Sequence, residues 1–182
     1  MTHLKLIEED AATGEVAKIY NEIKQEMGIP FVPNFFKIIA NSPYALAGMW
    51  SSIHNIMIKG QLPRSLKQMM FLSISVARNC MYCNATYMTF CKMSGVDEQT
   101  IIALVENIDN VQPQRTQDIV KFAVKCASEP LNLTTADYQK VRQHGVSSEE
   151  IAEIIAVAAH SVNCTIIAES MKIEIDEAII QG

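Results

Sequence analysis

Apolar residues recur every three or four positions along almost the whole chain, which is the period of an amphipathic α-helix. After Pro63 this spacing appears at Leu66, Met69, Met70, Ser73 and Ala77. No segment alternates apolar and polar residues between turn signals, as a half-exposed strand would. The pattern therefore predicts an all-α fold, a helical bundle of about eight helices joined mostly by short loops.

Capping residues, prolines and glycines mark the ends of the predicted helices. Ser42 precedes a proline that suits the first helical position, and Ser147 has the capping-box spacing to Glu150. We interpret Asn79 as a further cap, which places Cys80 in the first turn of the helix that follows. The predicted helices cover residues 13–27, 35–40, 42–60, 63–78, 79–94, 98–106, 113–129, 134–145 and 148–172. By length, residues 1–182 form a single domain.

Charge and composition exclude several classes of protein. Lys and Arg number 15 against 20 Asp and Glu, a net charge of −5, and the basic residues are scattered, so a nucleic-acid partner is not expected. With 49% apolar and 19% charged residues, disorder is not expected either. No uncharged apolar stretch of about 18 residues is present, so we expect no membrane partner. The first residues do not resemble a secretory signal, and we expect a cytoplasmic protein.

Two of the five cysteines, Cys80 and Cys83, form a C-x-x-C motif. An odd number of cysteines without an export signal does not indicate a structural disulfide framework. Residues three apart on a helix have Cα atoms about 5 Å apart, within the ~4.4–6.8 Å that a disulfide spans. The positive end of a helix also favours the reactive thiolate. The pair therefore suits cycling between dithiol and disulfide.

Two other interpretations of the pair remain open. His160 and Cys164 lie four residues apart and could complete a zinc site with it. Alternatively, Cys80 and Cys83 are small side chains packed in the core, as free cysteines often are. We expect Cys91, two turns beyond Cys83, to be a core residue.

The segment Leu62-Pro63-Arg64-Ser65-Leu66-Lys67-Gln68, followed by Ser75 and Asn79-Cys80-Met81-Tyr82-Cys83, resembles the core of the alkylhydroperoxidase AhpD-like, carboxymuconolactone decarboxylase-like family. Residues 14–20, 32–36, 41–43 and 147–176 resemble the peroxidase-related members. The resemblance covers about residues 12–177, with its core motif in 62–95. It implies an all-α AhpD-like fold, assembly into a homo-oligomer (dimer, trimer or hexamer), and a dithiol that reduces hydroperoxides.

The resemblance also implies roles for individual residues. Cys83 would be the peroxidatic nucleophile and Cys80 the resolving thiol. Gln68 and Tyr87 stand where the family has a Glu and a His that relay protons, so both parts of the relay are changed. Proton transfer by a positioned base contributes about 10²–10⁴-fold, and peroxidase activity could be lowered by that much.

Further residues are expected near the site. Tyr82, Tyr87 and Gln68 would line it, and Tyr87, one turn beyond Cys83, could donate to its sulfur. Arg78 would help to stabilise a thiolate. His54, which we also expect to line the site, or His160 could replace the lost base.

These observations lead to one expected function and two alternatives. We expect a peroxidase-related antioxidant oxidoreductase with a redox-active disulfide, which uses a hydroperoxide and an external dithiol reductant and needs no metal or organic cofactor. One alternative is a non-catalytic helical oligomer that binds a small ligand or partner. The other is a carboxymuconolactone decarboxylase-like lyase, which would not need the cysteine pair.

Overall fold

The computed structural model describes residues 4–180, and this part of the chain contains ten α-helices and no strand. The predicted all-α fold is therefore confirmed. The helices are α1 (Gly14–Met27), α2 (Asn34–Ile39), α3 (Pro43–Ile53), α4 (Arg64–Ala77), α5 (Met81–Met93), α6 (Glu98–Glu106), α7 (Gln114–Ser128), α8 (Thr135–Arg142), α9 (Ser148–Met171) and α10 (Glu177–Ile180). A π-helical turn, His54–Ile58, continues α3.

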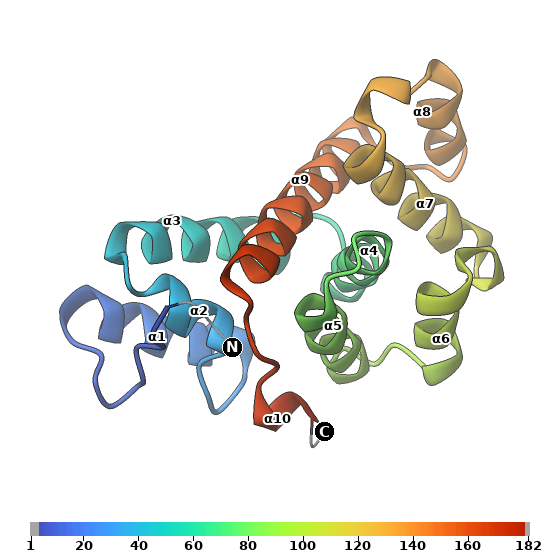
Figure 1. Cartoon of the computed structure of the whole chain (residues 1–182). Helices are drawn as coiled ribbons and strands as arrows, with labels where there is room; N and C mark the ends of the chain where they lie inside the picture. Colours follow the sequence, from blue (N-terminus) through green and yellow to red (C-terminus); the bar gives the residue numbers. More distant parts are fainter. Residues whose placement is uncertain (1–3, 181–182) are drawn as a thin grey trace.

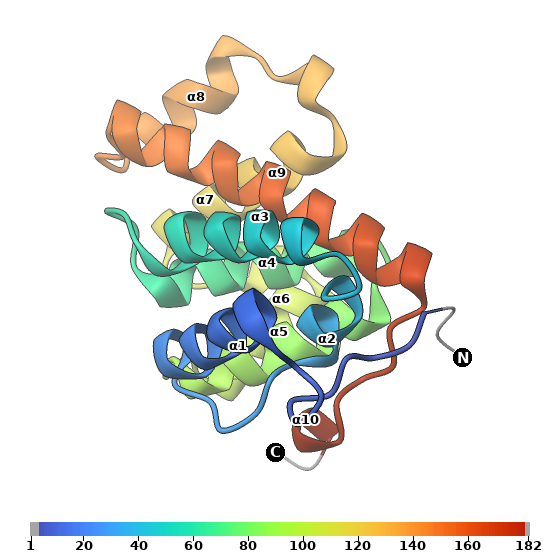
Figure 2. The same cartoon turned by 90° about the vertical axis from the view of Figure 1, so that its left-hand side faces the viewer.

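The long helix α9 runs diagonally through the molecule, with α1 to α3 on one side and α4 to α6 on the other (Figure 1). In the view turned by 90°, α9 lies above α3 and α4, and α1 and α2 lie below them (Figure 2). Helix α4 packs against α5, α7 and α9. It is buried on nearly every side, as expected of a helix that is apolar around most of its circumference. Any site on α4 or at its end is thus enclosed by the bundle.

Helix α9 is, among the described residues, the one helix long and apolar enough to cross a membrane by length and composition. Half of its most apolar window is buried inside the protein, against α4 and α7. Core helices of globular proteins have the same length and composition.

The predicted caps are mostly confirmed. Ser42 Oγ accepts a hydrogen bond from the Ala45 amide, and Ser147 forms a complete capping box with Glu150. Gly28 ends α1 in the left-handed conformation, with φ of 69°. The sequence pattern did not predict the π-helical turn or the short α10.

A buried ion pair fixes the loop that enters α4. Lys67, only 1% exposed, lies 3.1 Å from the Glu153 carboxylate of α9 and donates to the Ile56 carbonyl at 2.9 Å. The same carboxylate accepts hydrogen bonds from the amides of Gln61 and Leu62. This pair ties the π-helical turn, the loop and α9 together beside the helix that leads to the C-x-x-C motif.

Candidate active site

Two backbone motifs meet at Cys80, between α4 and α5. Helix α4 ends in a Schellman motif: the Asn79 amide donates to the Val76 carbonyl and the Cys80 amide to the Ser75 carbonyl, both at 3.0 Å. Asn79 has a φ of 56°, in the left-handed region that Asn tolerates. The N-cap of α5 is Cys80, whose sulfur accepts a hydrogen bond from the Cys83 amide at 3.3 Å. The prediction of Asn79 as the cap is therefore wrong by one residue, because Asn79 closes α4 instead.

Cys80 and Cys83 are free thiols, 0% and 3% exposed. The pKa of Cys83 is raised well above its ordinary value. The largest cause is its hydrogen bond with the Cys80 thiol, followed by burial and by the charges that Cys80, Cys164 and Glu169 would carry nearby. We expected the helix end to favour a thiolate. The surroundings instead keep Cys83 protonated at neutral pH, because burial disfavours the charged form.

Cys83 faces a small apolar cavity, which we call the thiol cavity. Its volume is about 40 Å³, enough for a few water molecules, since one needs ~10–15 Å³. Cys164 of α9 also lines it, whereas Cys80 does not. The full lining is Met27, Pro33, Phe35, Phe36, Ile53, Phe71, Tyr82, Cys83, Thr86, Tyr87, Phe90 and Cys164. Substrate in this cavity would meet Cys83 rather than Cys80.

A second cavity of about 20 Å³, the Gln68 cavity, adjoins the first and shares Tyr87 and Phe90 with it. It is lined by Met27, Ile53, Met57, Ile58, Arg64, Gln68, Tyr87 and Phe90. Gln68 is 5% exposed, and its Oε1 atom has no hydrogen-bond partner within the described part of the chain. A buried acceptor without a partner is unusual and costs free energy. A donor bound in this cavity would satisfy it.

The two tyrosines of the site have different roles. Tyr82 Oη donates to the buried Asp176 carboxylate at 2.9 Å and accepts from the Phe35 amide at 3.2 Å. This tyrosine therefore holds the C-terminal segment and α2 against α5. Tyr87 stacks on Phe71, with ring centroids 3.6 Å apart. Its hydroxyl makes no hydrogen bond to a described residue, so the expected bond to the Cys83 sulfur does not form in this structure. Burial raises the pKa of Tyr82 and of Tyr87, and neither is a base at neutral pH.

Two residues expected at the site lie elsewhere. His54 packs against Trp50 with the two rings tilted by 44° and lies 3.7 Å from the Glu26 carboxylate, and the structure does not place it in either cavity. The Arg78 guanidinium donates to Thr165 Oγ1 of α9 at 2.6 Å. Arg78 thus joins α4 to α9, and this bond rather than a thiolate occupies its Nε.

His160, which the sequence indicated only as a substitute base or zinc ligand, lies beside the thiol cavity. Its Nε2 atom is 3.3 Å from the sulfur of Cys164, and its Nδ1 atom is 2.9 Å from Ser52 Oγ. Burial lowers the pKa of His160 to about 4, so the ring is neutral at physiological pH.

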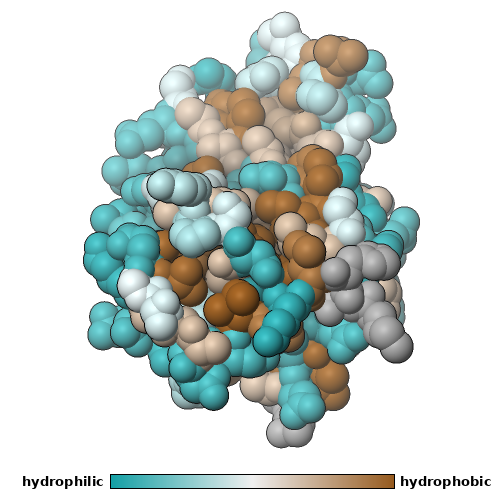
Figure 3. Space-filling model, turned by 60° about the vertical axis from the view of Figure 1, so that its left-hand side comes forward, coloured by the Kyte–Doolittle hydropathy of each residue, from teal (hydrophilic) through white to brown (hydrophobic). Residues whose placement is uncertain are grey.

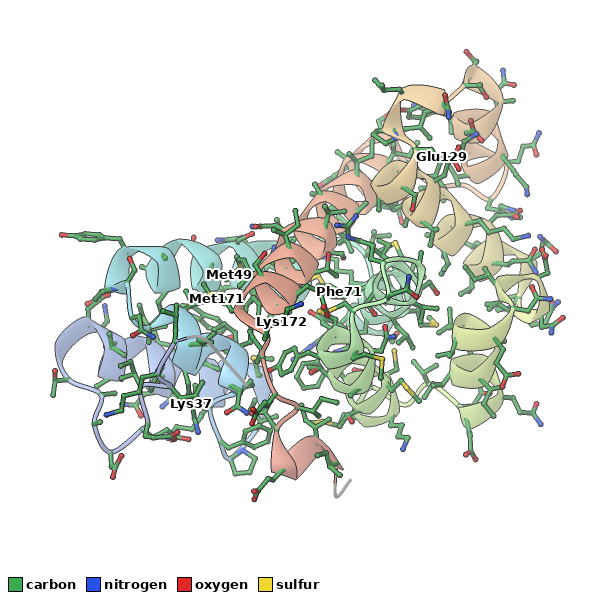
Figure 4. All side chains as sticks on the ribbon, viewed as in Figure 1. Lys37, Met49, Phe71, Glu129, Met171 and Lys172 are labelled. Carbon is green, nitrogen blue, oxygen red and sulfur yellow. The ribbon has the colours of Figure 1, made fainter. Side chains whose placement is uncertain are left out.

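The surroundings of this pair come from both sides of α9. Met49 of α3 and Phe71 of α4 lie on either side of α9 (Figure 4). Met49 contacts the Cys164 sulfur, and Phe71 meets the His160 ring edge to face. The described residues hold no group of three or more side chains that could bind a metal ion. The zinc interpretation required four ligands, and this geometry does not support it.

Residues 43–112 match the carboxymuconolactone decarboxylase family. No curated protein matches the chain in sequence. The fold matches an alkylhydroperoxidase AhpD core, a peroxidase-related protein from Ralstonia eutropha JMP134, with a TM-score of 0.89 and 20% identity over 98% of this chain and 94% of that one. For a peroxidase-related protein from Silicibacter sp. TM1040 the TM-score is 0.87, with 22% identity over 98% and 93%.

The debrominase Bmp8 is also similar, with a TM-score of 0.84 and 18% identity over 100% of this chain and 96% of that one. A cysteine-to-alanine variant of it has been crystallised with 2,3,4-tribromopyrrole. At these identities the structural likeness establishes a common fold, and enzymes of different activity share it.

Proposed function

We propose that this chain, whose residues 43–112 match the carboxymuconolactone decarboxylase family and whose fold is that of an AhpD core, is a peroxidase-related thiol oxidoreductase. The observation that carries this proposal is the position of its two thiols. Cys83 faces an apolar cavity, and Cys80 lies within the same helical turn, with its sulfur on the Cys83 amide.

In the first step, the terminal –OOH group of a hydroperoxide enters the thiol cavity. The Cys83 sulfur attacks the distal oxygen, the O–O bond breaks, and Cys83 becomes a sulfenic acid. The proton lost by the thiol goes to the departing oxygen, which leaves as an alcohol or as water. The free Oε1 atom of Gln68 would accept a hydrogen bond from a water or a substrate hydroxyl in the adjoining cavity, which orients it but does not remove a proton.

In the second step, Cys80 attacks the sulfur of the sulfenic acid. A disulfide forms, the S–O bond breaks, and water leaves. An external dithiol then reduces the disulfide by thiol exchange. The Cys83 amide favours Cys80 as the leaving thiolate in that exchange, because it already donates to the Cys80 sulfur.

The proposal is tested by following hydroperoxide consumption with excess dithiol in the native chain, Cys83→Ser, Cys80→Ser and Cys91→Ser. Cys91 is a matched control, since it is buried on the same helix but lines neither cavity. We expect turnover to fall to background in Cys83→Ser and to persist in Cys91→Ser. Equal, slow consumption in all four proteins would refute the proposal and favour the ligand-binding alternative. Conversion of a muconolactone without the thiols would favour the lyase.

A second substrate class is favoured by the aromatic lining of the thiol cavity. Six rings contribute to it: Phe35, Phe36, Phe71, Tyr82, Tyr87 and Phe90. Such a lining would pack against a flat apolar ring once the cavity, which now has room for a few waters, widens, and the debrominase has the same fold. The balanced reaction consumes an aryl bromide and two thiols, and it yields the arene, HBr and a disulfide. Bromide release from 2,3,4-tribromopyrrole that is lost in Cys83→Ser would support this class, and no release would exclude this substrate.

A further inference from the structure

The mechanism above leaves one nucleophile of the thiol cavity unused. Cys164 is 4% exposed, lies on α9, and lines the same cavity as Cys83, whereas Cys80 lines neither cavity. Helices α5 and α9 pack directly against each other. Cys164 also lies within electrostatic reach of Cys83, because a charge on Cys164 contributes to the raised pKa of Cys83.

Cys164 is also the one thiol of this site that has a base in contact. The 3.3 Å separation between its sulfur and His160 Nε2 suits transfer of the thiol proton. Ser52 Oγ, 2.9 Å from Nδ1, can accept a hydrogen bond from the tautomer that carries its proton there. In that tautomer Nε2 has a free lone pair directed at the thiol, so nucleophile, base and orienting group are in contact. Burial raises the pKa of Cys164, so its thiol reacts as its proton passes to His160 rather than as a standing thiolate.

We infer that Cys164 is a second resolving thiol, which forms a disulfide with Cys83 once Cys83 has been oxidised. This inference rests on the proposed function, because it begins from the Cys83 sulfenic acid. The oxygen of that acid must project into the cavity that Cys164 lines, so the attacking sulfur approaches from the cavity side.

The step is balanced without a further reactant. The Cys164 sulfur bonds to the Cys83 sulfur, and the S–O bond of the sulfenic acid breaks. His160 takes the Cys164 proton and returns it to the departing oxygen, which leaves as water. The product is a Cys83–Cys164 disulfide between α5 and α9, with Cys80 left as a free thiol for exchange.

The experiment uses the Cys80→Ser chain, in which the first resolving thiol is absent. After one equivalent of hydrogen peroxide we expect a mass loss of about 2 Da and a peptide linkage between Cys83 and Cys164. The matched control is the double variant Cys80→Ser with Cys164→Ser, which should retain the sulfenic acid, a gain of about 16 Da that dimedone traps. Far-ultraviolet circular dichroism before oxidation confirms that each variant is folded.

The role of His160 is tested in the same background. His160→Gln should slow formation of the Cys83–Cys164 disulfide by about 10²-fold at neutral pH, and this deficit should shrink as the pH rises, because hydroxide then takes the thiol proton in place of the imidazole. A purely structural histidine would give no such recovery.

The outcomes separate the two claims. Cys83 sulfenic acid that persists in Cys80→Ser while Cys164 stays free would overturn the inference and leave the proposed function intact. Cys83 that stays unoxidised in both the native and Cys80→Ser chains would overturn both.

Discussion

The Cys83 thiol is surrounded by sulfur atoms and aromatic rings and has no hydrogen-bonded base among the described residues. Hydrogen bonding to Cys80 and burial raise its pKa, so at neutral pH only a small fraction is the reactive thiolate. Below its pKa this fraction grows tenfold for each pH unit.

The first prediction follows from the raised pKa of Cys83. The rate at which Cys83 reacts with hydrogen peroxide should rise with pH, without a plateau, at least to pH 9, because the pKa is raised above the ordinary value of ~8.5. Initial oxidation rates between pH 6 and 9, compared with Cys83→Ser, measure it. A plateau below pH 8 would mean that the thiol is activated by a group this account omits.

The second prediction concerns Gln68, whose Oε1 atom has no partner and whose cavity adjoins the thiol cavity. Gln68→Glu supplies a buried carboxylate, which can accept a proton, and should raise the rate of peroxide reduction at pH 7 by about 10². Gln68→Met, of similar size but without an acceptor, is the control and should not raise it. Equal rates in the two variants would show that this cavity does not exchange protons with Cys83.

The third prediction concerns the stability of the neutral His160. Its pKa is lowered to about 4, whereas an unfolded histidine titrates near 6.5. Between these values the unfolded chain binds a proton that the folded chain does not, so stability is lost as pH falls from about 6.5 to about 4. The loss should reach about 3 kcal/mol. Urea unfolding at pH 7 and pH 4.5 should show a smaller loss for His160→Gln than for the native chain, and equal losses would contradict the assignment.

At the scale of single elements, local residues in the sequence predict where helices begin and end. They do not predict which distant elements contact one another. Ser42 and Ser147 signal the starts of their helices through their own side chains, and both predictions are confirmed. Asn79 failed because an Asn serves equally as an N-cap and as a left-handed C′ residue, and only the packing of α4 on α5 decides which. Asp176 was not singled out, since its bond to Tyr82 spans 94 residues.

The site residues also fall into those that local sequence predicts and those that depend on contacts between distant elements. The C-x-x-C motif and the neighbouring Tyr82, Tyr87 and Gln68 came from sequence, because one helical hairpin carries them all. The contact of His160 with Cys164 had only its four-residue spacing as a signal. The position of Cys164 in the same cavity as Cys83 depends on how α9 packs against α5, and no local sequence pattern predicts that packing.

The fourth prediction concerns the tie between α4 and α9. Lys67→Met removes a buried charge and leaves the partly buried Glu153 carboxylate without its cation but with its two amide donors, so the free energy of unfolding should fall by about 1.5–3 kcal/mol. Lys18→Met, on an exposed pair with Glu15, is the control and should change it by less than about 1 kcal/mol. Chemical denaturation of both variants measures the difference, and similar values would mean that the buried pair has no special structural role.

For the whole molecule, the family resemblance implies self-association, and the surface carries apolar side chains that an interface would cover. On the face that brings α1 and α3 forward, apolar side chains gather toward the middle and hydrophilic ones surround them (Figure 3). Tyr44, Met81 and Leu131 are 92%, 70% and 97% exposed. Large exposed apolar groups of this kind are common at interfaces between proteins.

The fifth prediction is therefore a homo-oligomer in solution. Light scattering after gel filtration should give a multiple of the 20.3 kDa chain mass, because association covers apolar surface. A mass near that of one chain at micromolar concentration would contradict it.

The central claim is that Cys80 and Cys83 are a redox pair that works with Gln68 and Tyr87 in the places where the resembled family has a Glu and a His. It is tested most directly by the intact mass of the reduced chain after one equivalent of hydrogen peroxide, compared with Cys83→Ser. The account predicts a loss of about 2 Da in the native chain, with the disulfide mapped to Cys83, and no such loss in the variant. An unchanged native mass, or an equal loss in both proteins, would contradict it.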